Sequence, residues 1–109
     1  MIIEQVPFHT IDWAAVPPTT HPGDPGVATW RTREIGNIRV RMVEYSPGYA
    51  ADHWCARGHV LLVLEGELTT ELADGRVFTM KAGSSYQVAE NDGEHRSRTA
   101  TGAKLFVVD

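Results

Sequence analysis

The chain has 109 residues, which is enough for one domain with a modest core and too few for two. Hydrophobic residues make up 42% of it and charged residues 22%, which is the balance of a folded globule rather than of a disordered chain. A formal net charge of −4 argues against nucleic acid as the main partner. No segment approaches the ~20 apolar residues that a membrane-spanning helix needs, so no membrane partner is expected.

The first residues, MIIEQVPFHT, lack the basic start, the apolar region and the cleavage site of a secretory signal. The single cysteine, Cys55, cannot form a disulfide within the chain, which is typical of proteins from a reducing compartment. We therefore expect a cytoplasmic protein.

Residues 1–29 are expected to form an N-terminal arm, and residues 30–109 a single domain. The turn-forming residues Pro17-Pro18, Pro22-Gly23 and Asp24-Pro25-Gly26 make residues 1–29 loop-like. We expect this arm to pack across its own domain or across a partner.

After the arm, short segments with strand-like composition alternate with turns such as Gly36-Asn37 and Asp74-Gly75. No segment shows a long helical period. Eight or nine short strands with turns between them predict an antiparallel barrel or sandwich. The expected strands are Trp30–Ile35, Ile38–Tyr45, Tyr49–Cys55, His59–Leu64, Glu67–Leu72, Val77–Lys81, Ser84–Val88, His95–Thr99 and Ala103–Val108.

Three potential metal ligands lie close together in GYAADHWCARGH. Side chains alternate between the two faces of a strand, so His53 and Cys55 are expected to point the same way. His59 begins the next strand, after a short turn. If the two strands are antiparallel neighbours, the three side chains meet at one point, and this predicts a metal site.

The stretch from Gly48 to Thr99 resembles the two sequence motifs of the cupin superfamily, small barrels that hold a metal inside. In the first motif Gly48, His53 and Gly66 match, whereas Cys55 replaces the second histidine and His59 takes the glutamate position. The resemblance implies an all-β fold, a small antiparallel jelly-roll β-barrel of the RmlC-like type with an extended N-terminal arm.

The second cupin motif begins at Gly83 and supplies a fourth candidate ligand, His95, while Thr99 stands where the motif has asparagine. The phrase ADHWCARGH followed by LEGELTTELADGR looks like a subgroup of small single-domain bacterial cupins with an Asp-His-Cys-Trp type of motif. The resemblance thus implies a metal site formed by His53, Cys55, His59 and His95.

The chemistry of these four donors favours some metals over others. One thiolate with three neutral imidazoles carries the charge of −1 that three histidines and a glutamate would carry. A thiolate ligand favours zinc, with iron, nickel or copper as alternatives, over magnesium or calcium. Four ligands bound at once would give the closed shell of a structural zinc site, and three would leave a position for catalysis. The sequence leaves both open.

Strand alternation also predicts which side chains share a face with the four donors and could line a small, mostly apolar pocket for an organic molecule. Tyr86 is expected to reach the same pocket and to donate its hydroxyl. The predicted pocket residues are Tyr49, Ala51, Leu61, Val63, Tyr86, Ser97 and Thr99.

The opposite faces of the strands carry two further patterns. Val60, Leu62 and Leu64 would point outward, and three outward aliphatic side chains need cover, so we expect a homodimer or a second sheet. Arginines alternate in pairs, and such pairs are typical of a solvated face. They are Arg31, Arg33, Arg39, Arg41, Arg96 and Arg98.

Three functions fit these observations. The first is a metal-dependent oxygenase, isomerase or lyase that acts on a small organic molecule, as the cupin resemblance implies. The second is a non-catalytic barrel that binds a metal or ligand, or senses redox state through Cys55. The third is a barrel that zinc stabilises and that acts through its dimer surface. We expect the first slightly more than the others.

Overall fold

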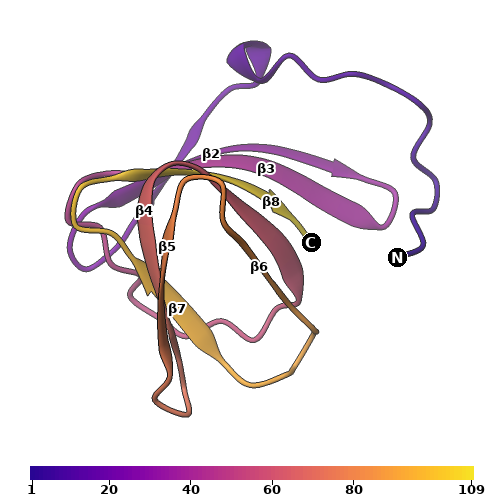
Figure 1. Cartoon of the computed structure of the whole chain (residues 1–109). Coiled ribbons are helices and arrows are strands. Elements are labelled where there is room, and N and C mark those ends of the chain that lie inside the picture. Colours follow the sequence, from indigo (N-terminus) through magenta and orange to yellow (C-terminus); the bar gives the residue numbers. More distant parts are fainter.

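Eight β-strands make up nearly all of the regular structure (Figure 1). The structure is a computed structural model and describes residues 1–109. The one helical element, η1 (Trp13–Ala15), is a single 3₁₀ turn, and the structure contains no helix that is long and apolar enough to cross a membrane. The strands are β1 (Thr19–Pro22), β2 (Val27–Ile35), β3 (Ile38–Tyr45), β4 (His59–Leu72), β5 (Val77–Lys81), β6 (Ser85–Val88), β7 (His95–Arg98) and β8 (Ala103–Val108).

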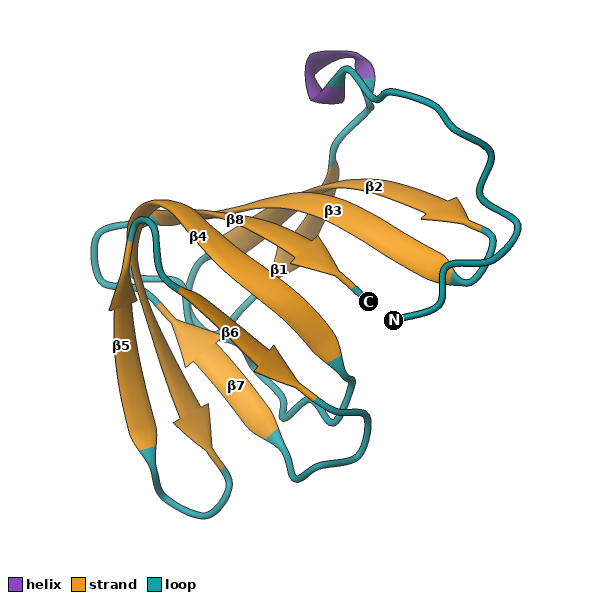
Figure 2. Cartoon of the chain, turned by 45° about the vertical axis from the view of Figure 1, so that its right-hand side comes forward, coloured by secondary structure: helices purple, strands orange, loops and turns teal.

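The strands form two antiparallel layers that share β4 (Figure 2). The first half of β4 pairs with β8 on one side and with β6 on the other, and the path continues from β8 through β3 and β2 to β1. The second half of β4 pairs with β5 and β7. The all-β antiparallel prediction is therefore confirmed, although the sheet does not close into a complete barrel.

The strand β4 changes layer near its middle. Its pairing with β8 shifts register between Val63 and Glu65, and Gly66 follows with φ +78°. Such an irregularity bends a strand, and a positive φ favours glycine because glycine has no Cβ. A Cβ at Gly66 would overlap the carbonyl oxygen of Gly102. The segments predicted as separate strands, His59–Leu64 and Glu67–Leu72, are thus one bent strand.

The hydrophobic core lies between the two layers. Its most deeply buried side chains, Val63, Leu68 and Leu105, come from β4 and β8. The outward-facing residues of β4 behave as alternation predicts, because Val60 is 40% exposed and Leu64 39% exposed.

Two regions differ from the predicted strands. Residues 1–29, predicted as loop, contain η1, β1 and the start of β2, because the turn residues between Pro22 and Val27 connect a hairpin. The segment Tyr49–Cys55, predicted as a strand, makes only two isolated bridges, Ala50 with Arg98 and Cys55 with His95. Between these bridges the chain bends away from the sheet and does not keep the alternation of a strand.

The N-terminal arm is attached to the domain near both of its ends. The Arg31 side chain donates to the carbonyl oxygens of Trp13 and Val16, and Val16 is buried. At the other end, the side chain of Asn37 accepts from the backbone N–H of Glu4. The arm therefore arches over β2 and β3 and returns to the tip of their hairpin (Figure 1).

Candidate functional site

Three polar side chains meet between the layers at one end of the domain. His59 begins β4, Tyr86 lies on β6 and His95 begins β7. The antiparallel register that places Tyr86 opposite Leu61 brings its hydroxyl within 2.8 Å of His59 Nε2. The ring centroids of His59 and His95 are 4.9 Å apart, and those of Tyr86 and His95 are 6.0 Å apart. Strands distant in sequence thus assemble one compact polar group.

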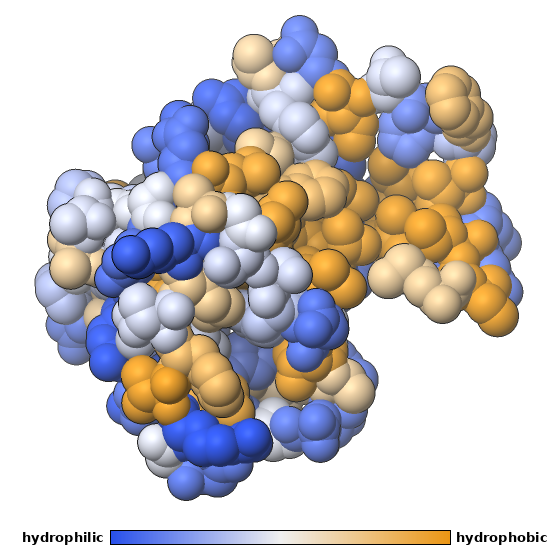
Figure 3. Space-filling view, viewed as in Figure 1, coloured by the Kyte–Doolittle hydropathy of each residue, from blue (hydrophilic) through white to orange (hydrophobic).

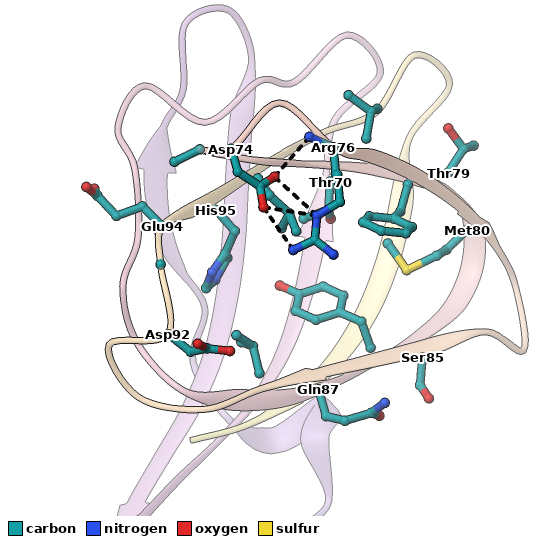
Figure 4. Close-up of a pocket in the computed structure, with 17 residues that line it drawn as sticks. Thr70, Asp74, Arg76, Thr79, Met80, Ser85, Gln87, Asp92, Glu94 and His95 are labelled. Atoms are coloured by element: carbon teal, nitrogen blue, oxygen red, sulfur yellow. Dashed lines mark hydrogen bonds and ion pairs between the residues drawn. The ribbon is translucent and has the colours of Figure 1, made fainter.

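Tyr86 and His95 line a cavity of about 630 Å³ (Figure 4). Its apolar wall includes Leu72, Met80 and Val88. Exposed charged side chains also line it, namely Asp74, Arg76, Asp92 and Glu94. Figure 4 shows Met80 on the side of the cavity opposite His95. A cavity of this size that combines apolar walls with polar groups can hold a small molecule.

His95 has an unsatisfied hydrogen-bonding atom. The residue is 4% exposed, and its Nε2 atom makes no hydrogen bond within the protein. Burial lowers the pKa of His95 and keeps its imidazole neutral near pH 7. A buried polar atom without a partner costs ~1–3 kcal/mol, so Nε2 is the polar atom of this residue that the protein leaves unsatisfied.

Tyr86 carries the second polar group of the cavity wall. Burial raises the pKa of Tyr86 well above that of a free phenol, so the hydroxyl stays protonated and can donate. Nearby, the hydroxyls of Thr70 and Ser97 hydrogen-bond each other at 2.7 Å. The phenol of Tyr86, the imidazole of His95 and the hydroxyl of Thr70 therefore belong to the cavity wall, and Ser97 lies behind Thr70 outside it.

His59 connects the cavity to a buried carboxylate. Its Nδ1 atom lies 3.9 Å from Oδ2 of Asp109 and has no hydrogen-bond partner. Burial, with a contribution from the nearby His95, lowers the pKa of His59 to about 4, although Asp109 acts in the opposite direction. His59 is thus neutral near pH 7. The carboxylate that faces Nδ1 favours the tautomer with the proton there, so that Nε2 accepts from Tyr86.

Three arginines surround Asp109, whose side chain is 1% exposed. Arg39 binds both carboxylate oxygens, at 2.9 and 2.8 Å, while Arg41 and Arg57 contact Oδ2 at 3.1 and 3.2 Å. Burial would raise the pKa of Asp109, but the hydrogen bond from Arg39 and the positive charges outweigh burial and lower it. Asp109 is therefore ionised at neutral pH.

The prediction that the alternating arginines line a solvated face is wrong for Arg39 and Arg41, because both point inward toward Asp109. The sequence reasoning also missed Asp109. The signal was present, since Asp109 continues the alternation of Leu105 and Val107, the buried side chains of β8.

The structure does not assemble the predicted metal set. His53 is exposed and its ring contacts Asp52 at 2.6 Å, because the chain at this point bends and does not continue a strand. The sulfur of Cys55 accepts from the backbone N–H of Arg57. No group of three or more His, Cys, Asp and Glu side chains lies close enough to hold a metal ion. Of the four predicted ligands, only His59 and His95 have their rings in contact.

The predicted pocket residues lie in different surroundings. Tyr86 is in the wall of the cavity, whereas Leu61 and Val63 belong to the hydrophobic core. The position of these three follows from their strands, since all of them face the space between the layers.

The other four predicted pocket residues are engaged elsewhere. Ser97 is held by Thr70, and the hydroxyl of Thr99 donates to a backbone carbonyl of β4. Tyr49 stacks on a second tyrosine, and the backbone N–H of Ala51 donates to the carbonyl of Ser97. These four do not line the cavity that Tyr86 and His95 share.

Comparison with solved structures identifies the fold. An RmlC-like cupin from Shewanella frigidimarina has a TM-score of 0.76 at 19% identity, and the match covers 95% of this chain and 91% of that one. A sugar phosphate isomerase of the cupin superfamily from Silicibacter pomeroyi has a TM-score of 0.71 at 18% identity, over 92% and 74% of the two chains.

A cupin-2 domain protein from Shewanella frigidimarina matches with a TM-score of 0.59 at 20% identity, over 73% of this chain and 78% of that one. No protein-family model matches the sequence, and no curated protein does so significantly. At these identities the likeness concerns the fold.

Proposed function

We propose that this chain, whose fold is that of the cupins, binds a small organic molecule in the cavity beside Tyr86 and His95 and isomerises it by proton transfer. The expected substrate carries a carbonyl group with an acidic C–H bond next to it. The observation that carries the proposal is His95, a residue of the cavity wall whose buried Nε2 atom lacks a partner.

The two polar groups of the cavity wall have complementary roles. A neutral imidazole can accept a proton from carbon, and a protonated phenol can donate one. If the substrate loses a proton to His95 and receives another from Tyr86, its formula is unchanged, so the reaction is an isomerisation. The protein returns to its starting state when His95 releases its proton and Tyr86 regains one through solvent.

His59 contacts the Tyr86 hydroxyl, and Asp109 lies on the other side of the His59 ring. The contact with His59 Nε2 holds the Tyr86 oxygen in place, and the Asp109 carboxylate favours the tautomer of His59 that accepts there. To donate to the substrate, the O–H of Tyr86 turns from Nε2 into the cavity. An imidazole between a carboxylate and a hydroxyl is a recurrent arrangement for orienting a reactive group.

The proposal uses no metal step, because the predicted donors His53 and Cys55 do not converge with His59 and His95. The fold likeness to a sugar phosphate isomerase supports an isomerase of the cupin type, although it does not identify the substrate. The cavity of about 630 Å³ accommodates a molecule of metabolite size.

Solvent exchange in D₂O tests the proposal across several classes of candidate substrate at once. Aldoses, ketoses, hydroxy acids and keto acids are incubated with the protein, and ¹H NMR follows the loss of the signal from the C–H bond next to the carbonyl. An isomerase of this kind exchanges that hydrogen for deuterium in its substrate, even when the net conversion is small.

His95→Asn should abolish both exchange and isomerisation, because it removes the group that takes the proton from carbon. Tyr86→Phe should abolish isomerisation, which the same spectra follow, because it removes the group that returns a proton. His53→Asn is the matched control, since it changes an exposed histidine and should retain full exchange. If no compound in the panel exchanges, or if both cavity variants remain as active as the control, the proposal is wrong.

A further inference from the structure

The strands β3, β8 and β4 present an apolar surface on the side that faces away from the core. They are neighbours in one sheet, and their side chains alternate between the core and the outside. Val43, Leu105 and Val63 stand opposite one another on the core side. The next side chains along each strand therefore point outward, and we call this side of the three strands the outer face. Its two apolar rows are Val40–Val108–Val60 and Met42–Phe106–Leu62, and all six side chains are partly or largely exposed.

The second layer of the protein does not cover the outer face. Leu68, from the second half of β4, and Met80, from β5, belong to the same core cluster as Val43 and Leu105. The second layer therefore packs on the opposite side of β3, β8 and β4. Of the two covers expected from the sequence, a second sheet and a homodimer partner, the sheet does not lie on this face.

The N-terminal arm borders the outer face and is held in place there. Arg31 stands opposite Met42, so both side chains point outward, and Arg31 donates to the carbonyl oxygen of Trp13. At the start of the arm, the side chain of Asn37 donates to the carbonyl oxygen of Ile2 at 2.8 Å. Figure 3 shows apolar side chains gathered around this end of the β2–β3 hairpin and the N-terminus. The arm thus extends the apolar surface of the sheet.

The exposed apolar area is as large as one side of a stable interface. Six large apolar side chains of the arm and of β4 are exposed. They are Met1 at 87%, Ile2 at 76%, Ile3 at 51%, Phe8 at 98%, Val60 at 40% and Leu64 at 39%. With ~200 Å² for a fully exposed residue of this size, these fractions amount to roughly 800 Å², the area that each partner of a standard interface buries.

Charges of both signs border the outer face. Arg33 stands opposite Val40 and is exposed. Glu44 stands opposite Lys104, which pairs with Glu65 at 3.6 Å. A border of one sign would repel a second copy of the same surface. A border that carries both signs suits a two-fold interface, in which one surface meets itself.

We propose that the outer face of β3, β8 and β4 is the interface of a homodimer, and that the arm of each chain packs Phe8 against its partner. Two sheets that pack face to face interdigitate their side chains, so the apolar rows of each copy would fill the space between the sheets. Burial of this apolar surface drives the association. The cavity beside Tyr86 lies on the core side, so the interface does not cover it, and the dimer does not rest on the proposed reaction.

Sedimentation velocity on the untagged full chain, at concentrations from about 1 to about 100 μM, tests the proposal because it spans dissociation constants in the micromolar range. The expected mass is twice the chain mass of 12.0 kDa. Val60→Lys places a charge in the outer face and should raise the dissociation constant of the dimer at least ~10-fold. Val77→Lys is the matched control, because Val77 is 52% exposed and lies on β5 in the other layer. Its dissociation constant should stay within about twofold of the original.

Phe8→Asp tests the part played by the arm and should also raise the dissociation constant at least ~10-fold. The side chain is 98% exposed in the single chain, so the substitution leaves the fold intact and carries the test even if Val60→Lys does not fold. Far-UV circular dichroism checks that each variant is folded.

A dimer that Val60→Lys and Phe8→Asp weaken, and that Val77→Lys does not, would support the proposal. A monomer at every concentration would overturn it, because a second copy would then not be what covers the outer face. Equal effects of Val60→Lys and Val77→Lys would place the interface elsewhere and would also overturn it. A dimer that Phe8→Asp leaves unchanged would contradict the role of the arm. None of these outcomes depends on the exchange experiment, so the two proposals can fail separately.

Discussion

The imidazole of His59 is the contact between the cavity and the charged cluster, because its Nε2 atom lies 2.8 Å from the hydroxyl of Tyr86 while its Nδ1 atom faces Asp109 at 3.9 Å. Chemistry in the cavity and the ion pairs of Asp109 therefore act on opposite sides of one ring. Predictions about stability, pH dependence and ligands follow from this arrangement.

Tyr86→Phe should lower the free energy of unfolding by about 1–2 kcal/mol. The substitution keeps the ring but removes its hydroxyl, so His59 Nε2 is left buried without a hydrogen bond. Urea denaturation of the two proteins at pH 7 measures the difference. An unchanged unfolding midpoint would show that solvent replaces the hydroxyl and that the His59–Tyr86 contact is not needed for stability.

Acidification should destabilise the protein between pH 6.5 and about 4. His59 has a pKa of about 4 in the folded state and about 6.5 when unfolded, so the unfolded chain binds the extra proton in this range. The stabilising contribution is complete above pH 6.5 and falls as the pH drops, by at most ~3 kcal/mol. The lowered pKa of His95 acts in the same direction.

Urea midpoints measured from pH 7.5 to 4.5 test this dependence. His59→Gln should flatten the curve, and the exposed His53→Gln should not. The pKa of Asp109 is lowered on folding, so its contribution is lost only at lower pH, below the ordinary carboxyl pKa of about 3.8. A curve of equal slope in both variants would contradict the role assigned to His59.

His53→Ala should change neither the metal content nor the fold, because the side chain is 79% exposed and lies outside the polar group around His59. Elemental mass spectrometry on untagged protein, purified without chelator or added metal, makes the comparison. About one zinc per chain in the original protein and its loss in His53→Ala would contradict this prediction. That result would restore the four-ligand site predicted from sequence.

Gly66→Ala should destabilise the fold by more than about 2 kcal/mol. The position has φ +78°, which strains an alanine, and the added Cβ would overlap the Gly102 carbonyl oxygen. Gly75→Ala is the matched control, because Gly75 also has a positive φ but a Cβ added there would meet no atom within 4 Å. Thermal unfolding should show a clearly larger loss for Gly66→Ala, and equal losses would mean that β4 tolerates the overlap.

Most of the sheet could be predicted from the sequence, because alternation and turn residues act locally. The bounds expected for Ile38–Tyr45, Val77–Lys81 and Ala103–Val108 are those of β3, β5 and β8. The outward direction of Val60 and Leu64 was also predicted correctly.

The candidate site was less predictable, because it depends on contacts between distant segments. Alternation was applied to His53 and Cys55, but the segment between them bends, so the assumption behind the metal set does not hold there. Arg39 and Asp109 are 70 residues apart in sequence, and only the pairing of β3 with β8 brings them together. No local sequence pattern predicts an ion pair between residues so far apart in the chain.

The bend of β4 has a consequence for motion. Both layers are hydrogen-bonded to the same strand, so they cannot slide past each other without breaking its ladders. The movement that preserves both ladders is a rotation about the segment near Gly66, where the register shifts. Such a rotation would widen the cavity by moving the first half of β4, which carries His59, away from β7, which carries His95.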